Sequence, residues 1–439
     1  MPRRLDAAQD EFAASFSDLL AERREAAVDV RSDVESIVAD VRARGDAALV
    51  DLNEKFDRLT LTADELRVPA AEIAAARKDC DPAVLDALDA ARARIMAYHE
   101  KQRPDGFDYV DDQGARLASR WRPVSAAGLY VPGGTAAYPS SVLMNALPAR
   151  VAGVERLVMA VPAPDGALNP LVLAAAEIAG VDEVYRVGGA QAIAALAYGT
   201  ATIEPVDKIV GPGNAYVAEA KRQVFGVVGI DMIAGPSEIL VVAEASADPA
   251  WVAADLLSQA EHDTSAQSIL ITDDAAFADA VEAAVASQIP QLPRHEIAGE
   301  SWERFGATIV VGDLDESVAL IDWIAPEHLE LMGPRAEALV ERIRNAGSIF
   351  LGAYAPEVLG DYLAGPNHVL PTARTARFSS GLGVLDFMKR SAMFAADAES
   401  FRALASPAMI LARAEGLEAH ARAVEVRLDG DPSDDPAGN

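Results

Sequence analysis

Apolar residues in roughly the first 120 positions recur three or four residues apart, as in VESIVADVRARGDAALVDLNEKFD. This spacing places the apolar side chains along one face of a helix. Pro104 and Gly106 interrupt the pattern, and a polar segment follows that ends at SRWRPVSAAGLYVPGG. We therefore expect a mostly helical region up to about residue 120.

The pattern then changes to short apolar runs rich in β-branched residues, namely RLVMAVP, EVYRVGG and KIVGPGN. Helical stretches such as NPLVLAAAEIAG and AQAIAALAYG separate these runs, and a second series follows with EILVVAE, AQSILITDD, ATIVVGD and SIFLGAY. Alternation of this kind is typical of βαβ units whose parallel sheet is covered on both faces. The sequence therefore predicts an α/β fold with two sheets. From about Ser391 the pattern is helical, and DGDPSDDPAGN closes the chain as a polar tail that we expect to be disordered.

Composition restricts the class of protein and its partners. The 439 residues suffice for two or three domains, and the formal net charge of −30 argues against nucleic acid and anionic membrane as partners. No run approaches the roughly 20 apolar residues of a membrane span, and the N-terminus lacks the apolar run of a signal peptide. The single cysteine fits a reducing cytoplasm, where we expect the protein to act.

Three glycine-rich segments follow predicted strands in the first series: LYVPGG, VGGAQ and VGPGN. Backbone N–H groups at such a strand exit favour a phosphate or carboxylate, especially where a helix begins. The third segment lacks the dinucleotide fingerprint, because Tyr216 occupies its last glycine position. A tight turn requires glycine in any case, but three such exits together indicate that one edge of the sheet faces a ligand.

Four of the six histidines lie near other groups that bind metals or protons. Gln259 and His262 are three positions apart in a helical pattern, so we expect their side chains on one face. Glu327 directly precedes His328 and offers a second proton-handling group. The other two are His368, seven residues after Asp361, and His420, five residues after Glu415. None of these spacings matches a standard zinc motif, so spacing alone leaves a metal site open.

Cys80 lies in AARKDCDPAVLDAL, a helical region without histidine or glycine neighbours. A reactive thiol requires a base or another electropositive group that lowers its pKa. An enzyme that oxidises an aldehyde through a thiohemiacetal would require a better-placed cysteine. We therefore expect Cys80 to be inert.

Eight segments occur together and in order over roughly residues 30–427. They are GLYVPGG, VGGAQAIAALAYGT, KIVGPGNAYVAEAKRQVFG, IDMIAGPSEILVVAE, DLLSQAEHD, APEHLEL, GDYLAGPNHVLPT and AEGLEAHARAV. In this set the chain closely resembles the histidinol dehydrogenase family. That resemblance implies oxidation of L-histidinol to L-histidine through a bound aldehyde, with NAD+ as hydride acceptor and one zinc ion per subunit.

The resemblance also implies residue roles, which we carry onto the matching positions. The zinc ligands would be Gln259, His262, Asp361 and His420. Glu327 and His328 would be the catalytic pair. Substrate would contact Ser237, His328, His368, Glu415 and the four zinc ligands, and NAD would contact Tyr130, Gln191 and Asn214.

The family's architecture implies two related, incomplete Rossmann-like domains with parallel sheets, plus small helical N- and C-terminal extensions. We expect 1–25 to be the N-terminal extension, 26–129 with 237–380 to form the first α/β domain and carry most zinc and catalytic residues, 130–236 to form an inserted second domain that contacts NAD, and 381–439 to be the helical C-terminal segment. The family is a homodimer in which the C-terminal segment reaches the partner subunit.

Two other classes of function remain as alternatives. A zinc hydrolase on a similar α/β scaffold would also use a metal, a Glu and a His, but it would not depend on NAD. A non-catalytic binding protein would tolerate replacement of Glu327 and His328.

Overall fold

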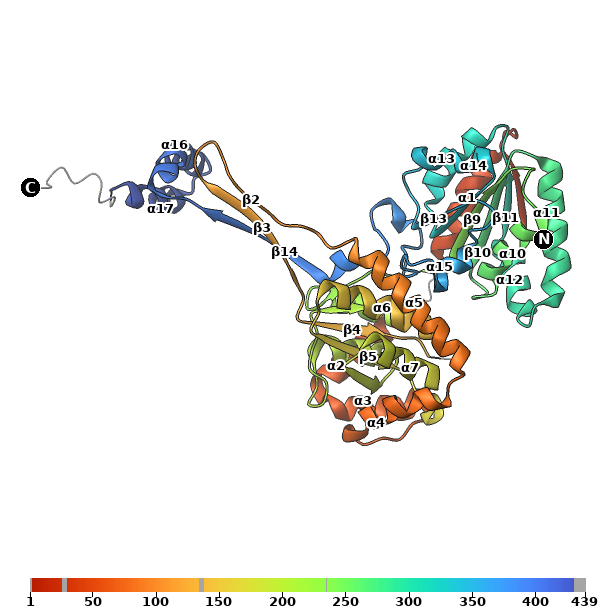
Figure 1. Cartoon of the computed structure of the whole chain (residues 1–439), viewed down its shortest axis with the longest axis horizontal. Helices are drawn as coiled ribbons and strands as arrows, with labels where there is room; N and C mark the ends of the chain where they lie inside the picture. The colour runs from red at the N-terminus through yellow and green to blue at the C-terminus, as the bar shows by residue number, and fades with distance from the viewer. Residues whose placement is uncertain (1, 26–29, 134–137, 234, 430–439) are drawn as a thin grey trace, which may run out of the picture. The chain divides into compact units, whose positions relative to one another are not determined.

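The computed structural model describes residues 2–25, 30–133, 138–233 and 235–429. Contacts divide the chain into two compact units. The larger unit comprises Met1–Gln102 and Val124–Phe387, and the smaller unit comprises Arg103–Pro123 and Met388–Asn439. Each unit is therefore built from two separate stretches of the chain, which Figure 1 colours by residue number. The acidic tail predicted at 429–439 lies almost wholly outside the described residues.

The larger unit contains a six-stranded parallel sheet in the order β1-β11-β10-β9-β12-β13. Its strands are β1 (Arg3–Asp6), β9 (Glu238–Ala243), β10 (Gln267–Thr272), β11 (Ala307–Val310), β12 (His328–Met332) and β13 (Ser348–Leu351). The helices that accompany it are α1 (Phe12–Glu25), α10 (Pro249–Ala260), α11 (Ala275–Gln288), α12 (His295–Phe305), α13 (Ser317–Ile324), α14 (Pro334–Glu337) and α15 (Glu357–Tyr362).

Central strand β9 shows why the strands of this sheet have continuous apolar sequences. Leu240 and Val242 belong to an apolar core with residues of α1 and α13, whereas Ile239 and Val241 belong to a second core with residues of α10, α11 and α12. Successive strand residues face opposite sides of a sheet, so both faces of this sheet are buried.

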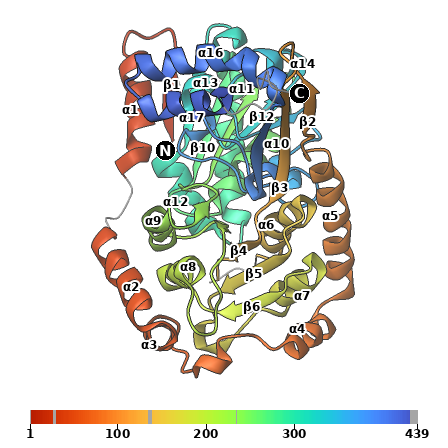
Figure 2. The same ribbon diagram turned by 90° about the vertical axis from the view of Figure 1, so that its left-hand side faces the viewer.

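A second parallel sheet in the larger unit has five strands in the order β6-β5-β4-β7-β8. Its strands are β4 (Ala126–Tyr130), β5 (Arg156–Val161), β6 (Glu183–Arg186), β7 (Lys208–Val210) and β8 (Gly229–Ile230). Helices α2 (Arg31–Arg44), α3 (Asp46–Asp57), α8 (Gly189–Tyr198) and α9 (Ala215–Val224) share one apolar core with it. Helices α4 (Ala70–Ala76), α5 (Pro82–Glu100), α6 (Pro139–Ala152) and α7 (Pro170–Ala179) contact one another, and Figure 2 shows them on the other side of the strands.

The two parallel sheets share one topology. Counted in chain order from β4 or from β9, both run 3-2-1-4-5, and β1 adds an extra strand at the edge of the six-stranded sheet. This is the Rossmann order without its sixth strand. The prediction of two related, incomplete Rossmann-like folds is therefore confirmed.

The smaller unit contains an antiparallel sheet in the order β14-β3-β2 and two helices packed on each other. Its elements are β2 (Phe107–Val110), β3 (Arg116–Pro123), β14 (Met388–Ala395), α16 (Ala398–Ala414) and α17 (Glu418–Asp429). Asp397 caps α16, because its carboxylate accepts a hydrogen bond from the backbone N–H of Ser400 at 2.9 Å. The C-terminal segment, expected to be helical, thus begins with a strand.

The N-terminal half also differs from the expected grouping. Residues 1–25 are not a separate helical extension, because β1 pairs with β11 and α1 packs in the core of the six-stranded sheet. Helices α2 and α3, expected to belong with 237–380, pack instead against the five-stranded sheet. A strand of four residues has too short a pattern to identify, and helical spacing does not reveal which sheet a helix covers.

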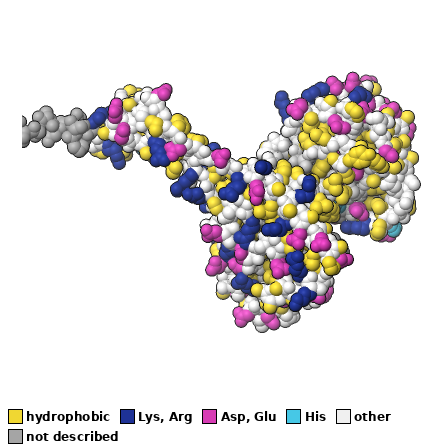
Figure 3. All heavy atoms as spheres, in the orientation of Figure 1, with side chains coloured by type: hydrophobic (Ala, Val, Ile, Leu, Met, Phe, Trp, Pro, Cys, Tyr) yellow, Lys and Arg dark blue, Asp and Glu magenta, His cyan; other side chains and the backbone are white. Residues whose placement is uncertain are grey.

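The surface charges and the lengths of the helices are relevant to the predicted absence of nucleic-acid and membrane partners. On the face that Figure 3 shows, Asp and Glu side chains are interspersed with Lys and Arg side chains. Such mixing is typical of a solvated surface. Among the described helices, none is both long and apolar enough to cross a bilayer.

Candidate active site

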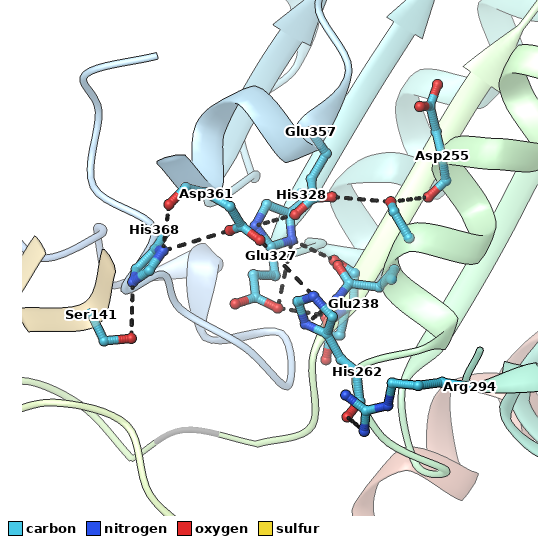
Figure 4. A network of polar contacts seen from close by, with 12 residues as sticks. Ser141, Glu238, Asp255, His262, Arg294, Glu327, His328, Glu357, Asp361 and His368 are labelled. Atoms are coloured by element: carbon cyan, nitrogen blue, oxygen red, sulfur yellow. Dashed lines mark hydrogen bonds and ion pairs between the residues drawn. The ribbon is translucent and has the colours of Figure 1, made fainter. Parts of the chain in front are cut away.

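Glu327 and His328 lie where β12 begins, beside Glu238 at the start of the neighbouring strand β9 (Figure 4). Helix α10 follows β9 and runs back along the sheet, so its last turn returns Gln259 to the same edge. Helix α15 brings Asp361 there. The predicted catalytic pair and three predicted zinc ligands therefore gather at the amino-terminal edge of the six-stranded sheet.

The backbone of Glu238 fixes both members of the predicted catalytic pair. Its N–H donates to Glu327 Oε2 at 2.9 Å, and its carbonyl oxygen lies 3.0 Å from His328 Nδ1. A carbonyl oxygen only accepts hydrogen bonds, so Nδ1 carries the proton and Nε2 keeps its lone pair. Burial lowers the pKa of His328 to about 4, which leaves the imidazole neutral at pH 7. His328 Nε2 is therefore a base ready to accept a proton.

Three of the four predicted zinc ligands converge. His262 Nδ1 lies 3.4 Å from Gln259 Nε2, and His262 Nε2 lies 4.0 Å from Asp361 Oδ2. Gln259 Oε1 is buried and has no hydrogen-bond partner among the described residues, a costly state for a polar atom unless a ligand occupies the site. His262 is not on helix α10 as expected: the helix ends at Ala260, and the backbone N–H of His262 bonds to the Gln259 carbonyl in the turn beyond.

His368 joins this edge of the sheet to helix α6. Its Nδ1 lies 3.0 Å from the backbone oxygen of Asp361 and 3.7 Å from Oδ1 of that residue, and its Nε2 lies 3.4 Å from Ser141 Oγ. Desolvation lowers the pKa of His368. Ser237, predicted to contact substrate, precedes Glu238 and lines a small cavity.

A second set of groups competes for a metal ion. Ligand atoms of His328, Glu357 and Asp361 all lie within 4.8 Å of one another. This set shares Asp361 with the predicted set but leaves Gln259 Oε1 without a partner. The predicted ligand set therefore stays a prediction beside this competitor.

The three residues predicted to contact NAD lie near the carboxyl edge of the five-stranded sheet. Tyr130 ends β4, Gln191 lies in the first turn of α8 after β6, and Asn214 caps α9 after β7. The Tyr130 hydroxyl accepts a hydrogen bond from the backbone N–H of Gly189 at 3.1 Å, and burial raises its pKa to about 12. Gln191 is only 2 % exposed, and its amide makes no hydrogen bond among the described residues.

The glycines of this edge also have a packing role. A Cβ on Gly133 or Gly188 would lie 2.5 or 2.4 Å from Pro162, and a Cβ on Gly211 would lie 2.1 Å from the Tyr130 carbonyl oxygen. The glycines alone therefore do not establish a ligand. The position of the edge does favour one, because β4 and β7 are the strands where the order reverses.

Comparison with known proteins decides the family. The family model for histidinol dehydrogenase matches residues 20–428. The chain belongs to the histidinol dehydrogenase family. It is 63 % identical to the enzyme of Rhodospirillum rubrum over 98 % of this chain and 99 % of that one, and 62 % identical to the enzyme of Ruegeria pomeroyi with the same coverage. The crystal structure of histidinol dehydrogenase from Elizabethkingia anophelis matches with a TM-score of 0.93 and 36 % identity over 98 % of each chain.

The remaining two predicted site residues lie in the smaller unit. Glu415 follows the last residue of α16, and His420 lies on α17. Both are exposed, and the described residues give His420 no hydrogen bond from its ring. The assignment of these residues stays a prediction.

Sequence reasoning missed the buried acids behind His328. Glu357 Oε1 lies 3.6 Å from His328 Nε2, and the backbone N–H of Glu357 donates to Glu330 Oε1 at 2.6 Å. Desolvation raises the pKa of Glu357 to about 8, that of Asp255 to about 6, and that of Glu330 well above its usual value. An apolar strand interrupted by Glu330, in HLELM, was the one signal of this cluster in the sequence.

Proposed function

We propose that this chain oxidises L-histidinol to L-histidine through L-histidinaldehyde, with two NAD+ and one water consumed in each cycle. The observation that carries the proposal is the placement of a neutral His328, with Nε2 as its base, among Glu327, Asp361, His262 and Gln259. Oxidation of an alcohol requires removal of a hydroxyl proton as hydride leaves, and a positioned imidazole is suited to this. The single cysteine fits the cytoplasm as the site of the reaction.

The residues of the site fit a zinc ion. Gln259 Oε1, a His262 nitrogen and an Asp361 oxygen form a mixed N/O set, and His420 would be the fourth ligand. Zinc would orient the substrate's polar groups and polarise its oxygen.

Metal content should separate the two candidate ligand sets. We expect His262→Ala to lose zinc during dialysis against a chelator. Its zinc affinity should fall by more than the about 10–100-fold that is typical when a residue hydrogen-bonded to a metal ligand is replaced. Glu357→Gln keeps the side-chain shape and should retain one zinc per chain. Elemental analysis of both dialysed variants measures this. Zinc retained in His262→Ala and lost in Glu357→Gln would place the ion on His328, Glu357 and Asp361.

Proton handling falls to His328 and Glu327. His328 Nε2 accepts the hydroxyl proton of the alcohol, returns it to the aldehyde oxygen as water adds, and then accepts the hydroxyl proton of the hydrated aldehyde. Glu327 takes a proton from the water that hydrates the aldehyde, because its carboxylate is held by the Glu238 N–H beside His328. NAD+ supplies the hydride acceptor for both oxidations.

Two features support the five-stranded sheet as the place where NAD binds. Its carboxyl edge carries Gln191, which is 2 % exposed and whose amide makes no hydrogen bond among the described residues. At the corresponding edge of the six-stranded sheet, the Glu244 carboxylate lies against Gly333, where an added Cβ would meet it. Glu244 is buried there and accepts a hydrogen bond from the Ser246 hydroxyl. A buried carboxylate at that position disfavours a pyrophosphate.

We also propose a homodimer in which the smaller unit completes the partner's site. The smaller unit is rich in exposed apolar side chains: Phe394 is 63 % exposed, and Ile410 and Leu411 are each 64 % exposed. Apolar surface of this kind marks a contact with another chain. Glu415 and His420 lie in the same unit, so its docking would deliver both to a neighbouring site.

One assay separates this function from the two rivals. Zinc-loaded protein supplied with L-histidinol and NAD+ should form two NADH and one histidine per histidinol. The absorbance of the NADH band measures the first product. A zinc hydrolase produces no NADH, and a binding protein produces neither NADH nor histidine. Histidinol consumed without NAD+ would overturn the proposal.

Cys80→Ser should change neither oxidation step by more than about twofold. The thiol donates to the Ala76 carbonyl oxygen at 3.3 Å, and burial raises its pKa, so little thiolate forms at neutral pH. Separate assays with histidinol and with histidinaldehyde measure the two steps. Loss of aldehyde oxidation alone would indicate a covalent route through this cysteine.

A further inference from the structure

Helix α3 brings an acidic residue to the carboxyl edge of the five-stranded sheet. Asp57, the last residue of α3, accepts a hydrogen bond from the backbone N–H of Ala163, just beyond the end of β5, at 3.3 Å. One turn earlier, Asn53 Nδ2 donates to the backbone oxygen of Arg186 at the end of β6 at 2.7 Å. The end of α3 is therefore fixed against the carboxyl ends of two neighbouring strands.

The charge of Asp57 is unfavourable for folding at this position. It is only 8 % exposed, and desolvation raises its pKa. It also carries its charge at the carboxyl end of a helix, where the helix dipole disfavours an anion. Its Oδ2 has the Ala163 N–H, but Oδ1 has no hydrogen-bond partner among the described residues. The Ala163 N–H and the Arg58 charge favour the carboxylate. A charge that nevertheless stands at the unfavourable end of a helix is typical of a functional residue.

The position of Asp57 has a known use in dinucleotide-binding sheets. An acidic residue about 20 positions after the first glycine-rich turn, at the end of the second strand, binds the ribose hydroxyls of NAD. In this chain β5 is the second strand of the 3-2-1-4-5 order, and the residues that follow it are Pro162, Ala163 and Pro164. The first acid after β5 is Asp165, which pairs with Arg58, whereas α3 places the Asp57 carboxylate at the backbone N–H of Ala163.

We propose that Asp57 accepts hydrogen bonds from the adenosine ribose hydroxyls of NAD and makes this enzyme prefer NAD to NADP. This inference rests on the proposed NAD site at the same edge. Asp57 is electrostatically coupled to Tyr130, one of the residues predicted to contact NAD. A carboxylate at the ribose repels the additional 2′-phosphate of NADP.

The neighbouring arginine does not offset that repulsion. Arg58 Nε donates to Asp165 Oδ1 at 2.7 Å, and a second contact joins the same two side chains. Both side chains are largely exposed, and Arg58 adopts a left-handed backbone conformation with φ of 54°. The pair with Asp165 therefore engages the guanidinium that a 2′-phosphate would otherwise recruit.

The test is Asp57→Asn, which keeps the shape of the side chain and an oxygen for the Ala163 N–H. We expect its Kd for NAD+ to rise about 10–100-fold, the effect of losing hydrogen bonds to a charged acceptor. The Kd for NADP+ should rise less or fall, so the preference for NAD+ drops at least tenfold. Calorimetric titration of the zinc-loaded protein with each dinucleotide measures both constants independently of turnover.

A modified ligand distinguishes a direct contact from a structural role. Wild type should bind 2′-deoxy-NAD+ more weakly than NAD+ by at least fivefold, and Asp57→Asn should bind the two with nearly equal affinity, since the coupling of residue and hydroxyl is then lost. Asp57→Asn should also unfold at no lower denaturant concentration than wild type. The matched control is Asp51→Asn, an exposed acid on the same helix that pairs with Arg44; its affinities should not change.

The binding measurements distinguish a ribose contact of Asp57 from a purely structural role. A tenfold loss of NAD+ affinity without a change in preference, or equal sensitivity of both proteins to the deoxy ligand, would show that Asp57 only positions the loop at Ala163 and would overturn the inference. Wild type that binds neither dinucleotide would refute the proposed function itself. In Asp57→Asn combined with Asp165→Asn, which releases Arg58, NADP+ should bind more tightly than in Asp57→Asn. Unchanged NADP+ affinity there would contradict the role given to Arg58.

Discussion

His328→Asn should lower the turnover of histidinol by about 10²–10⁴-fold, the usual contribution of general acid–base catalysis. Asparagine can still donate from its amide to the Glu238 carbonyl, the partner of His328 Nδ1, so the strand start should keep its structure. It has no nitrogen that accepts a proton in place of Nε2. Stopped-flow measurement of NADH formation at saturating histidinol and NAD+ gives the rate of the first oxidation, and steady-state turnover gives the whole cycle.

The matched control is His295→Asn, an exposed histidine at the start of α12 outside the site. Its turnover, zinc content and unfolding midpoint should all equal those of wild type. His328→Asn should share the zinc content and the midpoint but not the turnover. Normal turnover in His328→Asn would remove this residue from the mechanism, whereas lost zinc would make it a ligand.

Glu327→Gln should affect the second oxidation more than the first. Only the second consumes water, and the amide cannot take a proton from that water, although it can accept the Glu238 N–H as Glu327 does. With histidinaldehyde as substrate the loss should reach about 10²–10⁴-fold, and with histidinol the first NADH should form with a smaller loss. Equal losses for both substrates would contradict the assignment of water activation to Glu327.

Local patterns predicted much of the fold because the central strands are apolar and regular. EILVVAE and AQSILITDD became β9 and β10, and their alternate residues enter two different cores. Strand β1 was missed because RRLD has no apolar run and its partner β11 lies some 300 residues later in the chain. Strand β12 was missed because His328 and Glu330 interrupt its apolar residues. Polar side chains enter this strand because it begins at the site.

The candidate site was predictable where its residues are neighbours in sequence. Glu327 and His328 are adjacent, and His368 bonds to the backbone of Asp361, seven residues before it at the end of α15. The contacts made across the fold carried no sequence signal. Glu238 and Glu327 are 89 positions apart, Ser141 and His368 are 227 apart, and Asp57 and Ala163 are 106 apart. The tertiary packing of strands, helices and loops brings these pairs together, and no periodic pattern encodes it.

Two inactive variants should restore activity to each other if His420 is donated across the dimer. His420→Ala lacks a ligand in the smaller unit, and His262→Ala lacks one in the larger unit. In a heterodimer one site has both defects, whereas the other combines an intact His262 with an intact His420. Random pairing of equal amounts should therefore give about a quarter of all sites active, for free subunit exchange in a two-fold dimer. Co-expression with two affinity tags and tandem purification isolates the heterodimer, in which half of the sites should be active in the NADH assay with zinc.

The control pair is His262→Ala with Asp361→Ala, because both changes lie in the larger unit, about 4.0 Å apart at their nearest polar atoms. Each site of that heterodimer lacks one ligand, so mixing should restore nothing. Activity in the first pair but not in the second therefore assigns His420 to the neighbouring site. Inactivity of both purified heterodimers would mean that His420 serves its own chain. Activity in both pairs, with each parent inactive, would mean that His262 and Asp361 of one chain do not serve the same site.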